Sequence, residues 1–157
     1  MIELRKMNQQ EFAEYMKYSV DNYAAEKEKG EGLSPTDAMT VAKESFERLL
    51  PQGLQTPDQF LFTVVDSGTK SSAGILWIAK KMNGDKPYAF IYDIELKAEN
   101  RGKGLGKILM NLMEEEARRL GCVSVGLHVF GHNTAAIALY EKSGFITTNR
   151  MMKKDLK

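Results

Sequence analysis

The sequence is poor in the residues that cross-link small proteins or bind metals. Its 157 residues include one cysteine, Cys122, and two histidines, His128 and His132. A single cysteine excludes an internal disulfide and a cysteine-rich metal site. Two histidines without a convincing third ligand do not make a metal site either. We therefore expect no metal.

The sequence also lacks a strong excess of either charge and any long apolar run. It has 22 basic and 21 acidic residues, for a net charge of +1. This gives no general argument for binding nucleic acid or an anionic membrane, so any positive field must be local. No apolar run approaches the ~20 residues of a membrane span, and the first five residues, MIELR, lack a signal-peptide core. We expect a cytoplasmic protein without a nucleic-acid or membrane partner.

The length and composition favour one domain, residues 1–157. A hydrophobic fraction of 43% and a charged fraction of 27% are typical of a globular protein with a real core. Alternating apolar positions predict a short strand over residues 2–7, and Asn8 suits the cap of a following helix. The charged residues 26–32 predict a loop. A second helix is predicted from Ser34, because serine suits the cap, Pro35 the first turn and Asp37 a capping box.

From residue 59 onward the apolar pattern changes to that of strands. Short turns separate the strand-like runs, which predicts an antiparallel meander. A strongly periodic helix, a strand and a short helix follow, and the helix–strand order favours a right-handed parallel crossover. Two last runs predict a closing hairpin. The expected strands are residues 60–65, 73–79, 88–96, 122–129, 145–148 and 151–156, and the expected helices are 105–120 and 133–142.

A glycine-rich stretch joins the strand 88–96 to the periodic helix. Gly102, Gly104 and Gly106 stand among Arg101, Lys103 and Lys107, directly before the helix. Amides at a helix start, free of side chains and flanked by positive charge, favour an anion such as a pyrophosphate. The spacing differs from that of a P-loop, and the stretch follows a late strand rather than the first strand of a dinucleotide fold. A nucleotide-binding domain is therefore the weaker interpretation.

Two segments together resemble the GNAT N-acetyltransferase superfamily. Arg101-Gly102-Lys103-Gly104-Leu105-Gly106, placed after Ile94-Glu95-Leu96, resembles the acyl-CoA signature of that family. The segment from Asn133 to Phe145 resembles its N-x-x-A-x-x-x-Y-x-x-x-G-F pattern, with Ala136, Tyr140 and Gly144 in place. The resemblance implies an α/β (α+β) fold with a mixed, mostly antiparallel seven-stranded sheet, about four flanking helices, and a fourth and fifth strand that splay apart.

The resemblance also implies a use for these residues. Acetyl-CoA would be the co-substrate, and the acceptor would be a primary amine that attacks the thioester directly. The backbone of Ile94, Glu95 and Leu96 would pair with the pantetheine arm, and Asn133, Ala136 and Tyr140 would also contact the cofactor. The pyrophosphate would be bound by Arg101, Gly102, Lys103, Gly104, Leu105, Gly106 and Lys107.

Tyr140 is the candidate acid that protonates the leaving thiolate, since a phenol of pKa ~10 can donate to it. It lies two helical turns after Asn133, so the two residues share a face. The alternative is a tyrosine that only packs on the sheet. The base stays open among His128, whose ordinary pKa of ~6.5 suits the task, Glu95 and Asp93. Asp93 and Glu95 alternate with Ile94 and so should share one sheet face.

The acceptor pocket should come from the first two helices and neighbouring strands. Tyr15, Tyr18, Tyr23 and Trp77 are candidates to line it, although aromatic residues at helical spacing also form ordinary cores. Residues 24–33 could form a lid or simply a solvated loop. A non-catalytic acyl-CoA-binding or sensor module of the same fold is the alternative function. A homodimer is possible, but no feature of the sequence demands one.

Overall fold

The computed structural model describes residues 1–157, which form one five-stranded sheet with helices on both faces. The strands lie in the order β1-β2-β3-β4-β5, and only the β4–β5 pair is parallel. No helix combines the length and apolar character needed to cross a bilayer. The elements are β1 (Ile2–Lys6), α1 (Gln9–Glu31), α2 (Pro35–Leu49), the 3₁₀ turn η1 (Gly53–Gln55), β2 (Gln59–Asp66), β3 (Ser72–Asn83), β4 (Lys86–Leu96), the 3₁₀ turn η2 (Ala98–Asn100), α3 (Leu105–Arg119), β5 (Val125–Leu127) and α4 (Thr134–Lys142).

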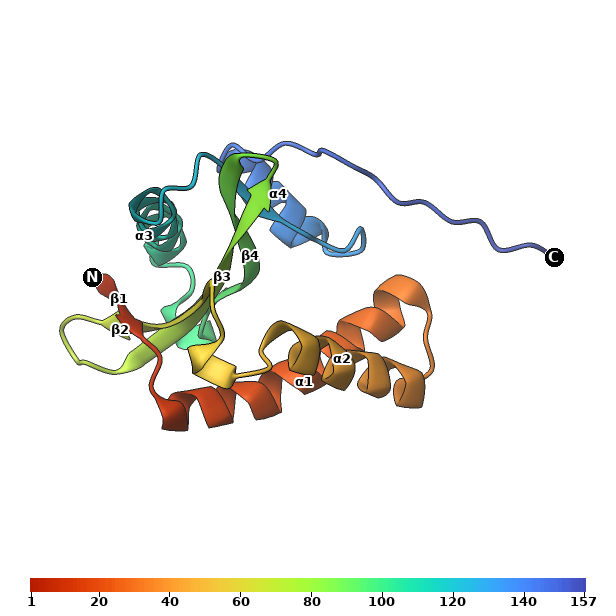
Figure 1. The fold of residues 1–157 in the computed structure, drawn as a ribbon, viewed down its shortest axis with the longest axis horizontal. Helices are drawn as coiled ribbons and strands as arrows, with labels where there is room; N and C mark the ends of the chain where they lie inside the picture. The colour runs from red at the N-terminus through yellow and green to blue at the C-terminus, as the bar shows by residue number, and fades with distance from the viewer.

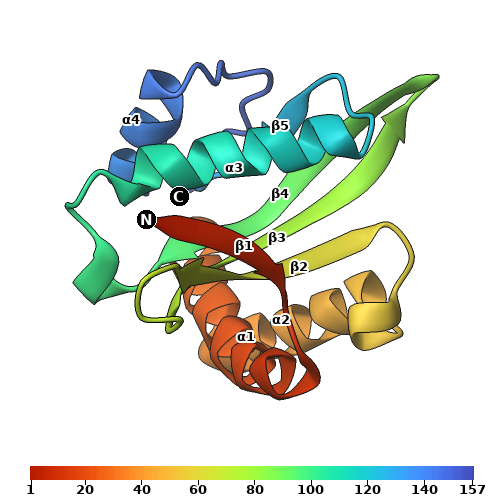
Figure 2. The same cartoon turned by 90° about the vertical axis from the view of Figure 1, so that its left-hand side faces the viewer.

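The twisted sheet separates two helical layers. Helices α1 and α2 lie together on one face, whereas α3 and α4 lie on the other (Figures 1 and 2). The three central strands form the predicted antiparallel meander, and β3 turns into β4 through Gly84 and Asp85. The mixed α/β class and the four helices are therefore confirmed.

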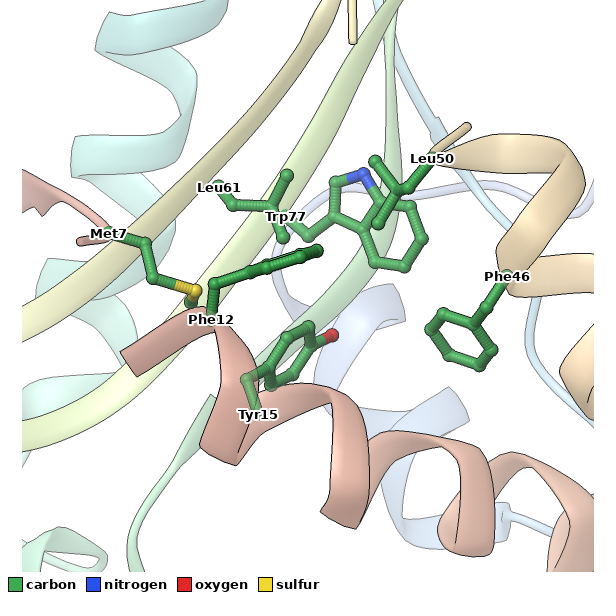
Figure 3. Packing of buried hydrophobic residues seen from close by; sticks show 7 residues of the cluster. All are labelled: Met7, Phe12, Tyr15, Phe46, Leu50, Leu61 and Trp77. Carbon is green, nitrogen blue, oxygen red and sulfur yellow. The ribbon is translucent and has the colours of Figure 1, made fainter. Parts of the chain in front are cut away.

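The α1–α2 face of the sheet carries an aromatic core. Phe12 and Tyr15 from α1 and Phe46 from α2 pack on Leu61 and Trp77 of the sheet (Figure 3). The indole of Trp77 lies 5.6 Å from the ring of Phe46 and 4.7 Å from that of Tyr92, centroid to centroid. Burying several large aromatic rings fixes α1 and α2 firmly against the sheet.

The opposite face carries an aliphatic core under α3. Met110 and Met113 of α3 pack on Leu76, Ile78 and Ile91 of the central strands. Leu76, Ile78 and Met113 are fully buried. The long apolar stripe predicted for this helix is therefore the face that α3 packs against the sheet.

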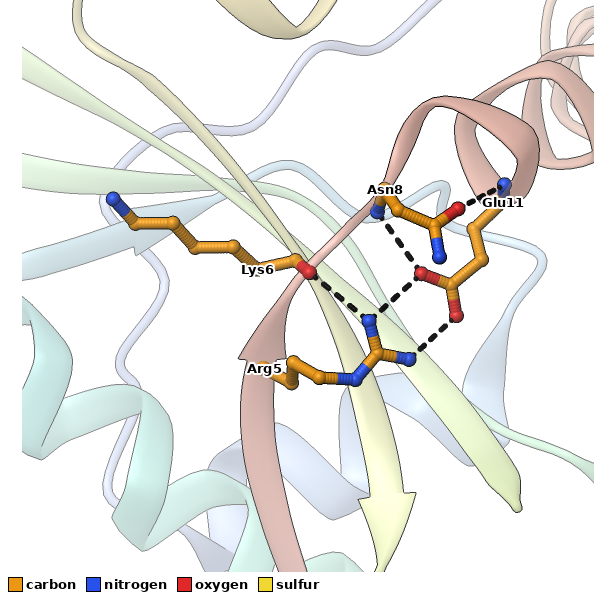
Figure 4. Close-up of polar contacts among 4 residues, drawn as sticks. All are labelled: Arg5, Lys6, Asn8 and Glu11. Atoms are coloured by element: carbon orange, nitrogen blue, oxygen red, sulfur yellow. Dashed lines mark hydrogen bonds and ion pairs between the residues drawn. The ribbon is translucent and has the colours of Figure 1, made fainter. Parts of the chain in front are cut away.

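The start of α1 is held by the capping interactions that Asn8 suggested. The Asn8 side chain accepts a bond of 2.8 Å from the Glu11 amide, and the Glu11 carboxylate accepts one of 2.9 Å from the Asn8 amide (Figure 4). Arg5 then pairs with Glu11 at 2.8 Å. At α2, Ser34 accepts from the Asp37 amide at 3.1 Å, which confirms the cap, but the Asp37 carboxylate forms no bond back to the Ser34 amide, so the predicted capping box is not complete.

The loop predicted over residues 26–32 is wrong, because α1 continues to Glu31. Glu and Lys are good helix formers, so a charged stretch need not end a helix. Lys27 and Glu31 form an ion pair of 2.6 Å one turn apart. Gly32 ends the helix in the left-handed conformation (φ 68°), and its amide donates to the Glu28 carbonyl. Helix α1 is therefore 23 residues long, which leaves no flexible lid in this part of the chain.

The extended α1 brings Gly30 against Phe130 of the β5–α4 connection. A β-carbon at Gly30 would overlap the ring of Phe130. We expect Gly30→Ala to gain about 1 kcal/mol from helix propensity but to lose it to this clash. In a Phe130→Ala background the gain should appear in full. Urea unfolding of the four proteins measures it, and additive effects of the two substitutions would contradict the contact.

The seven-stranded sheet is also wrong, because the predicted closing hairpin does not form. Residues 145–157 contain no strand, and the C-terminal segment extends away from the sheet (Figure 1). Its apolar side chains, Ile146, Met151, Met152 and Leu156, are all at least 82% exposed. A hairpin that buries no apolar face is at best marginally stable, so the alternation of residues alone did not ensure a strand.

Strand β5 is shorter than predicted, and this leaves one end of β4 without a neighbour. Only Val125, Gly126 and Leu127 pair, with Ala89, Phe90 and Ile91 of β4. Residues 122–124 and 128–129 are not in the strand. Strand β4 continues to Leu96 along β3, so residues 92–96 have no neighbour on the β5 side. The fourth and fifth strands therefore separate, as expected.

Candidate functional site

The glycine-rich loop presents a row of free amides at the start of α3. None of the amides from Gly102 to Lys107 donates a hydrogen bond to a backbone carbonyl. Gly104 is the N-cap of α3 in the left-handed conformation (φ 76°) and caps without a side chain. A β-carbon at Gly102, Gly104 or Gly106 would meet nothing within 4 Å. The loop is thus open and rich in donors, as an anion site at a helix start requires.

Of the three basic residues in this loop, Arg101 is turned toward β4. Its Nε donates to the Leu96 carbonyl at 2.9 Å, and its Nη2 lies 3.3 Å from the Glu95 carboxylate. Lys103 and Lys107 are exposed beside the free amides. Arg101 therefore links the loop to the carboxylates of β4, while the two lysines supply the positive charge of the loop.

An irregularity in β4 directs its carboxylates toward α1. Trp77 pairs with Asp93 and Ile78 with Ile91, which leaves Tyr92 as an extra residue, a β-bulge. One extra residue shifts the side-chain alternation, so Tyr92 and Asp93 both face the α1 layer. Ile94 returns to the α3 side, and Glu95 again faces α1. Asp93 and Glu95 do share a face, as predicted, and the face is that of the α1 aromatics.

Asp93 is largely buried and hydrogen-bonded to α1. The phenol of Tyr15 donates to its Oδ2 at 2.7 Å. Burial raises the pKa of Asp93 to about 6, and the charges of Glu95 and Glu26 act in the same direction, while the bond from Tyr15 opposes them. Burial, and then Asp93 itself, raise the pKa of Tyr15 well above its ordinary value. Asp93 is therefore a carboxylate that exchanges its proton near pH 6, well above the ordinary range of an aspartic acid.

Glu95 is the second carboxylate on this face and is more exposed. The phenol of Tyr18 donates to its two oxygens at 2.7 and 2.5 Å, and Arg101 lies on its other side. Burial, with the bond to Glu95, raises the pKa of Tyr18 to about 12. Glu95 is thus held in place by one neutral donor and one cation.

Tyr140 lies on α4, and no hydrogen bond joins it to Asp93 or Glu95. Burial raises its pKa, and the charges of Asp93 and Glu26 raise it further, so its phenol lies within their electrostatic range. Its ring packs edge-on against Phe145 at 5.7 Å. Asn133 caps α4 by accepting from the Ala136 amide at 3.3 Å, which confirms the cap. Tyr140 therefore packs against the core, and the nearby carboxylates still affect the pKa of its phenol.

The two histidines lie outside this group. His128 follows the end of β5 and is exposed, and its ring packs edge-on against Phe130 at 4.9 Å. His132 is exposed as well, and its ring stacks on that of Phe130 at 5.6 Å. Neither hydrogen-bonds to Asp93, Glu95 or Tyr140. The structure thus joins Tyr15 to Asp93 and Tyr18 to Glu95 by hydrogen bonds, whereas His128 forms none with these carboxylates.

A pocket of about 130 Å³ lies between α1 and β4. Three of the four aromatic residues expected to line it do so, namely Tyr15, Tyr23 and Trp77. The fourth, Tyr18, binds Glu95 of the lining. Residues that the sequence did not suggest also line it: Ser19, Asn22, Glu26, Phe46 and Tyr92.

A signal for some of the missed residues was present in α1. Ser19, Asn22 and Glu26 continue the helical face that begins at Tyr15, at steps of three and four residues. Extending the stripe beyond its apolar members would have found them. The bulge that turns Tyr92 toward this face has no comparable signature in the sequence.

The fold and this site define a class of protein. The profile of the Acetyltransferase (GNAT) family matches residues 13–145, which is most of the chain. The chain therefore belongs to the GNAT acetyltransferase family, whose members transfer an acetyl group from acetyl-CoA to an amine.

Two proteins of Bacillus subtilis are similar to this chain over nearly its whole length. The chain is 39% identical to the uncharacterized N-acetyltransferase YycN of Bacillus subtilis (strain 168), covering 99% of both proteins. It is 31% identical to the uncharacterized N-acetyltransferase YdgE of the same strain, covering 98% of this chain and 97% of YdgE. The crystal structure of YycN superposes with a TM-score of 0.93 over 100% of this chain and 99% of YycN.

A more distant structure shares the fold alone. AAC(6')-Iy, in complex with the bisubstrate analogue CoA-S-monomethyl-acetylneamine, is 17% identical and superposes with a TM-score of 0.59. It covers 100% of this chain, and this chain covers 99% of it. This chain is thus an acetyltransferase by family, like its uncharacterized relatives.

Proposed function

We propose that the chain acts as a single domain, residues 1–157, that transfers the acetyl group of acetyl-CoA to a primary amine. The observation that carries the proposal is the buried carboxyl of Asp93 on β4, hydrogen-bonded to Tyr15, with the Tyr140 phenol within range of its charge. The pKa of the carboxyl is raised to about 6, and that of the phenol is raised above its usual value. Two titratable groups with such different pKa values suit the roles of base and acid.

The glycine loop and the free edge of β4 fit the donor. Acetyl-CoA supplies an acetyl group already activated as a thioester. The free amides of Gly102 to Lys107, with Lys103 and Lys107 beside them, would hold its pyrophosphate. The backbone of Ile94 to Leu96 would hold the pantetheine arm, because it has no strand partner on the β5 side, although the Leu96 carbonyl already accepts from Arg101. Asn133 and Ala136 would complete the cofactor contacts from α4.

Asp93 and Tyr140 would move the two protons of the reaction. Asp93 would accept a proton from the incoming ammonium, so that the free amine can attack. Tyr140, which its raised pKa keeps protonated, would give its proton to the departing sulfur, and the second proton that the nitrogen loses as the amide forms would restore the phenol. An amide of the β4 edge would stabilise the negative charge that develops on the carbonyl oxygen.

Other candidate groups suit these tasks less well. Glu95 is engaged by Tyr18 and Arg101, so we assign it to positioning and charge. His128 is exposed and apart from the carboxylates. Cys122 is buried among Ala89 and Ala117, and burial raises its pKa, which disfavours the thiolate. A direct attack by the amine therefore suits the chain better than a covalent acyl-enzyme.

The release of free thiol from acetyl-CoA across a panel of primary amines tests the proposed function. At least one amine should accelerate release well above the rate without amine. Gly104→Glu should weaken acetyl-CoA binding more than tenfold in calorimetry, because it places a carboxylate among the phosphate-binding amides. Gly84→Glu is the matched control, since Gly84 also has a positive φ (65°) and open space around it. Binding of acetyl-CoA without release for any amine would instead indicate a sensor.

A further inference from the structure

The pocket between α1 and β4 carries more negative charge than acetyl transfer to a single amine requires. Its lining includes Glu26, Asp93 and Glu95 and no basic side chain. Arg101 lies against Glu95 from outside the lining, and nearby Lys27 is paired with Glu31. Glu26 forms no ion pair. Its charge acts on both Asp93 and Tyr140, so it faces the reacting groups without a cation of its own.

A buried hydroxyl without a partner points to a ligand in the same pocket. Ser19 is only 4% exposed, and its Oγ has no hydrogen-bond partner in the chain. A side-chain contact with Ser19 lowers the pKa of the Tyr15 phenol, but the phenol donates its proton to Asp93, and Ser19 Oγ forms no hydrogen bond of normal geometry. Buried polar groups are nearly always satisfied. A donor or acceptor of a bound molecule would satisfy this one.

The walls and size of the pocket restrict what that molecule can be. Trp77, Tyr92 and Phe46 form a continuous aromatic wall, which suits both methylene groups and an ammonium. The pocket volume of about 130 Å³ is that of a small-molecule site, and a short aliphatic chain fits it.

The carboxylates are spaced along the pocket. They do not converge as the ligands of a metal ion would. Asp93 and Glu95 are two residues apart on β4, about 6–7 Å between their Cα atoms, and Glu26 is exposed on α1 at the solvent side. Glu26 and Asp93 belong to different elements that line the same pocket, so a molecule that contacts both carboxylates needs two separated ammonium groups. Butane-1,4-diamine is a short molecule of this kind.

From these observations we infer that the acceptor is a short aliphatic diamine, with one amine beside Asp93 for acetylation and the second ammonium held by Glu26. This inference rests on the proposed function and narrows its substrate class. The second ammonium stays charged and does not react. Its contacts with Glu26 and with the aromatic wall would select a dication over a monoamine of the same length.

Four matched substrates test the selection, with acetyl-CoA at saturation and thiol release as the readout. They are butane-1,4-diamine, butan-1-amine, 4-aminobutan-1-ol and 4-aminobutanoate. We expect kcat/KM to be at least about tenfold higher for the diamine than for butan-1-amine, with the alcohol close to the monoamine and the acid lowest. Equal values for diamine and monoamine would overturn the inference while leaving acetyl transfer itself intact.

Two variants test whether the preference for the diamine over the monoamine arises in this pocket. Glu26→Gln should bring the diamine-to-monoamine ratio close to one. Glu14→Gln, also exposed on α1 but outside the lining, should preserve the wild-type ratio. A ratio that Glu26→Gln does not change would overturn the assignment of the second ammonium to Glu26.

Ser19→Ala separates a ligand contact from a structural role. Because the hydroxyl has no partner in the chain, its removal should raise the Tm of the free protein and raise KM for the diamine. A lower Tm would indicate a structural role and count against the inference.

Calorimetry with butane-1,4-diamine in the presence of CoA provides a readout independent of turnover. Should no amine be acetylated, the proposed function fails. Diamine binding that weakens at least about tenfold in Glu26→Gln would still support the pocket, and binding that is equal in the two proteins would overturn it.

Discussion

Tyr140→Phe is expected to lower kcat for acetyl transfer by about 10²–10⁴-fold, the usual contribution of a general acid. The raised pKa of the phenol keeps its proton in place at neutral pH, so that it is available to the departing sulfur. Phenylalanine keeps the ring that packs on Phe145. The fold and the affinity for acetyl-CoA should therefore change little.

Steady-state kinetics and acetyl-CoA titration of the same preparation separate the two effects. Tyr88→Phe, in the β4 segment paired with Lys81 at the far end of the sheet, is a control for the loss of a phenol and should keep wild-type kcat. A Tyr140→Phe protein with undiminished kcat would leave Tyr140 with only its packing role. Equal losses of kcat and of acetyl-CoA affinity would make it a binding residue instead.

Asp93→Asn is expected to abolish most activity and at the same time to stabilise the protein above pH 6. The folded protein holds the proton of Asp93 up to about pH 6, whereas an unfolded aspartic acid releases it near pH ~3.9. Between these values the folded state binds more protons, so this group makes stability fall as the pH rises from about 4 to 6. Above pH 6 the loss is complete, on the order of 3 kcal/mol at about 1.4 kcal/mol per pKa unit.

Asparagine removes this loss and can still accept the hydrogen bond from Tyr15. Urea unfolding should show Asp93→Asn to be more stable than the wild type at pH 8 and equal to it near pH 4. Asp21→Asn, exposed on α1, controls for the change of net charge and should show no such pH dependence. A constant difference between Asp93→Asn and the wild type across this range would contradict the raised pKa.

The pH–rate profile distinguishes Asp93 from His128 as the base. The wild type should lose kcat/KM below about pH 6. A histidine of ordinary pKa would give a similar loss of kcat/KM at low pH. Variants of the two residues are therefore needed to tell which one is the base. His128→Ala should keep the limb, because the exposed His128 lies apart from the carboxylates, whereas Asp93→Asn should lose it together with about 10²–10⁴-fold of the rate.

Gain of stability with loss of activity is the behaviour expected of a functional carboxylate. An ionised group held in a desolvated pocket is unfavourable for folding, and catalytic sites often retain such groups. Asp93 fits this description, and so does the unpartnered hydroxyl of Ser19. Both lie on the wall of one pocket, whereas the loop from Gly102 to Lys107 lies at the end of β4. The proposed donor and acceptor sites thus lie in different parts of the chain.

Local chemistry made the scaffold of the site predictable. The capping residues Asn8, Ser34 and Asn133 act through neighbours three residues away, so short segments specify them. The amides of the glycine loop are free because a helix start leaves them so. The apolar stripe of α3 and the three meander strands follow from periodicity. A periodic apolar face predicts its element without knowledge of the partner against which it packs.

The errors arose where the outcome depends on distant partners. The charged end of α1 stays helical through the Lys27–Glu31 pair and ends only at Gly32, against Phe130 from a segment a hundred residues later. The final hairpin had the alternation of strands but no apolar surface to cover. His128 looked like a base on a strand, yet β5 ends one residue before it.

The sequence by itself determined the family, the glycine loop and the tyrosine of α4, because each depends on residues close together in the chain. Only the tertiary structure decided which carboxylate is buried against the aromatic residues of the pocket. A single extra residue, Tyr92, shifts the alternation of β4 and turns Asp93 toward Tyr15, seventy-eight positions away. The pKa of Asp93 is then set by burial and by charges from two elements, Glu95 on β4 and Glu26 on α1, and these come together only when the chain is folded.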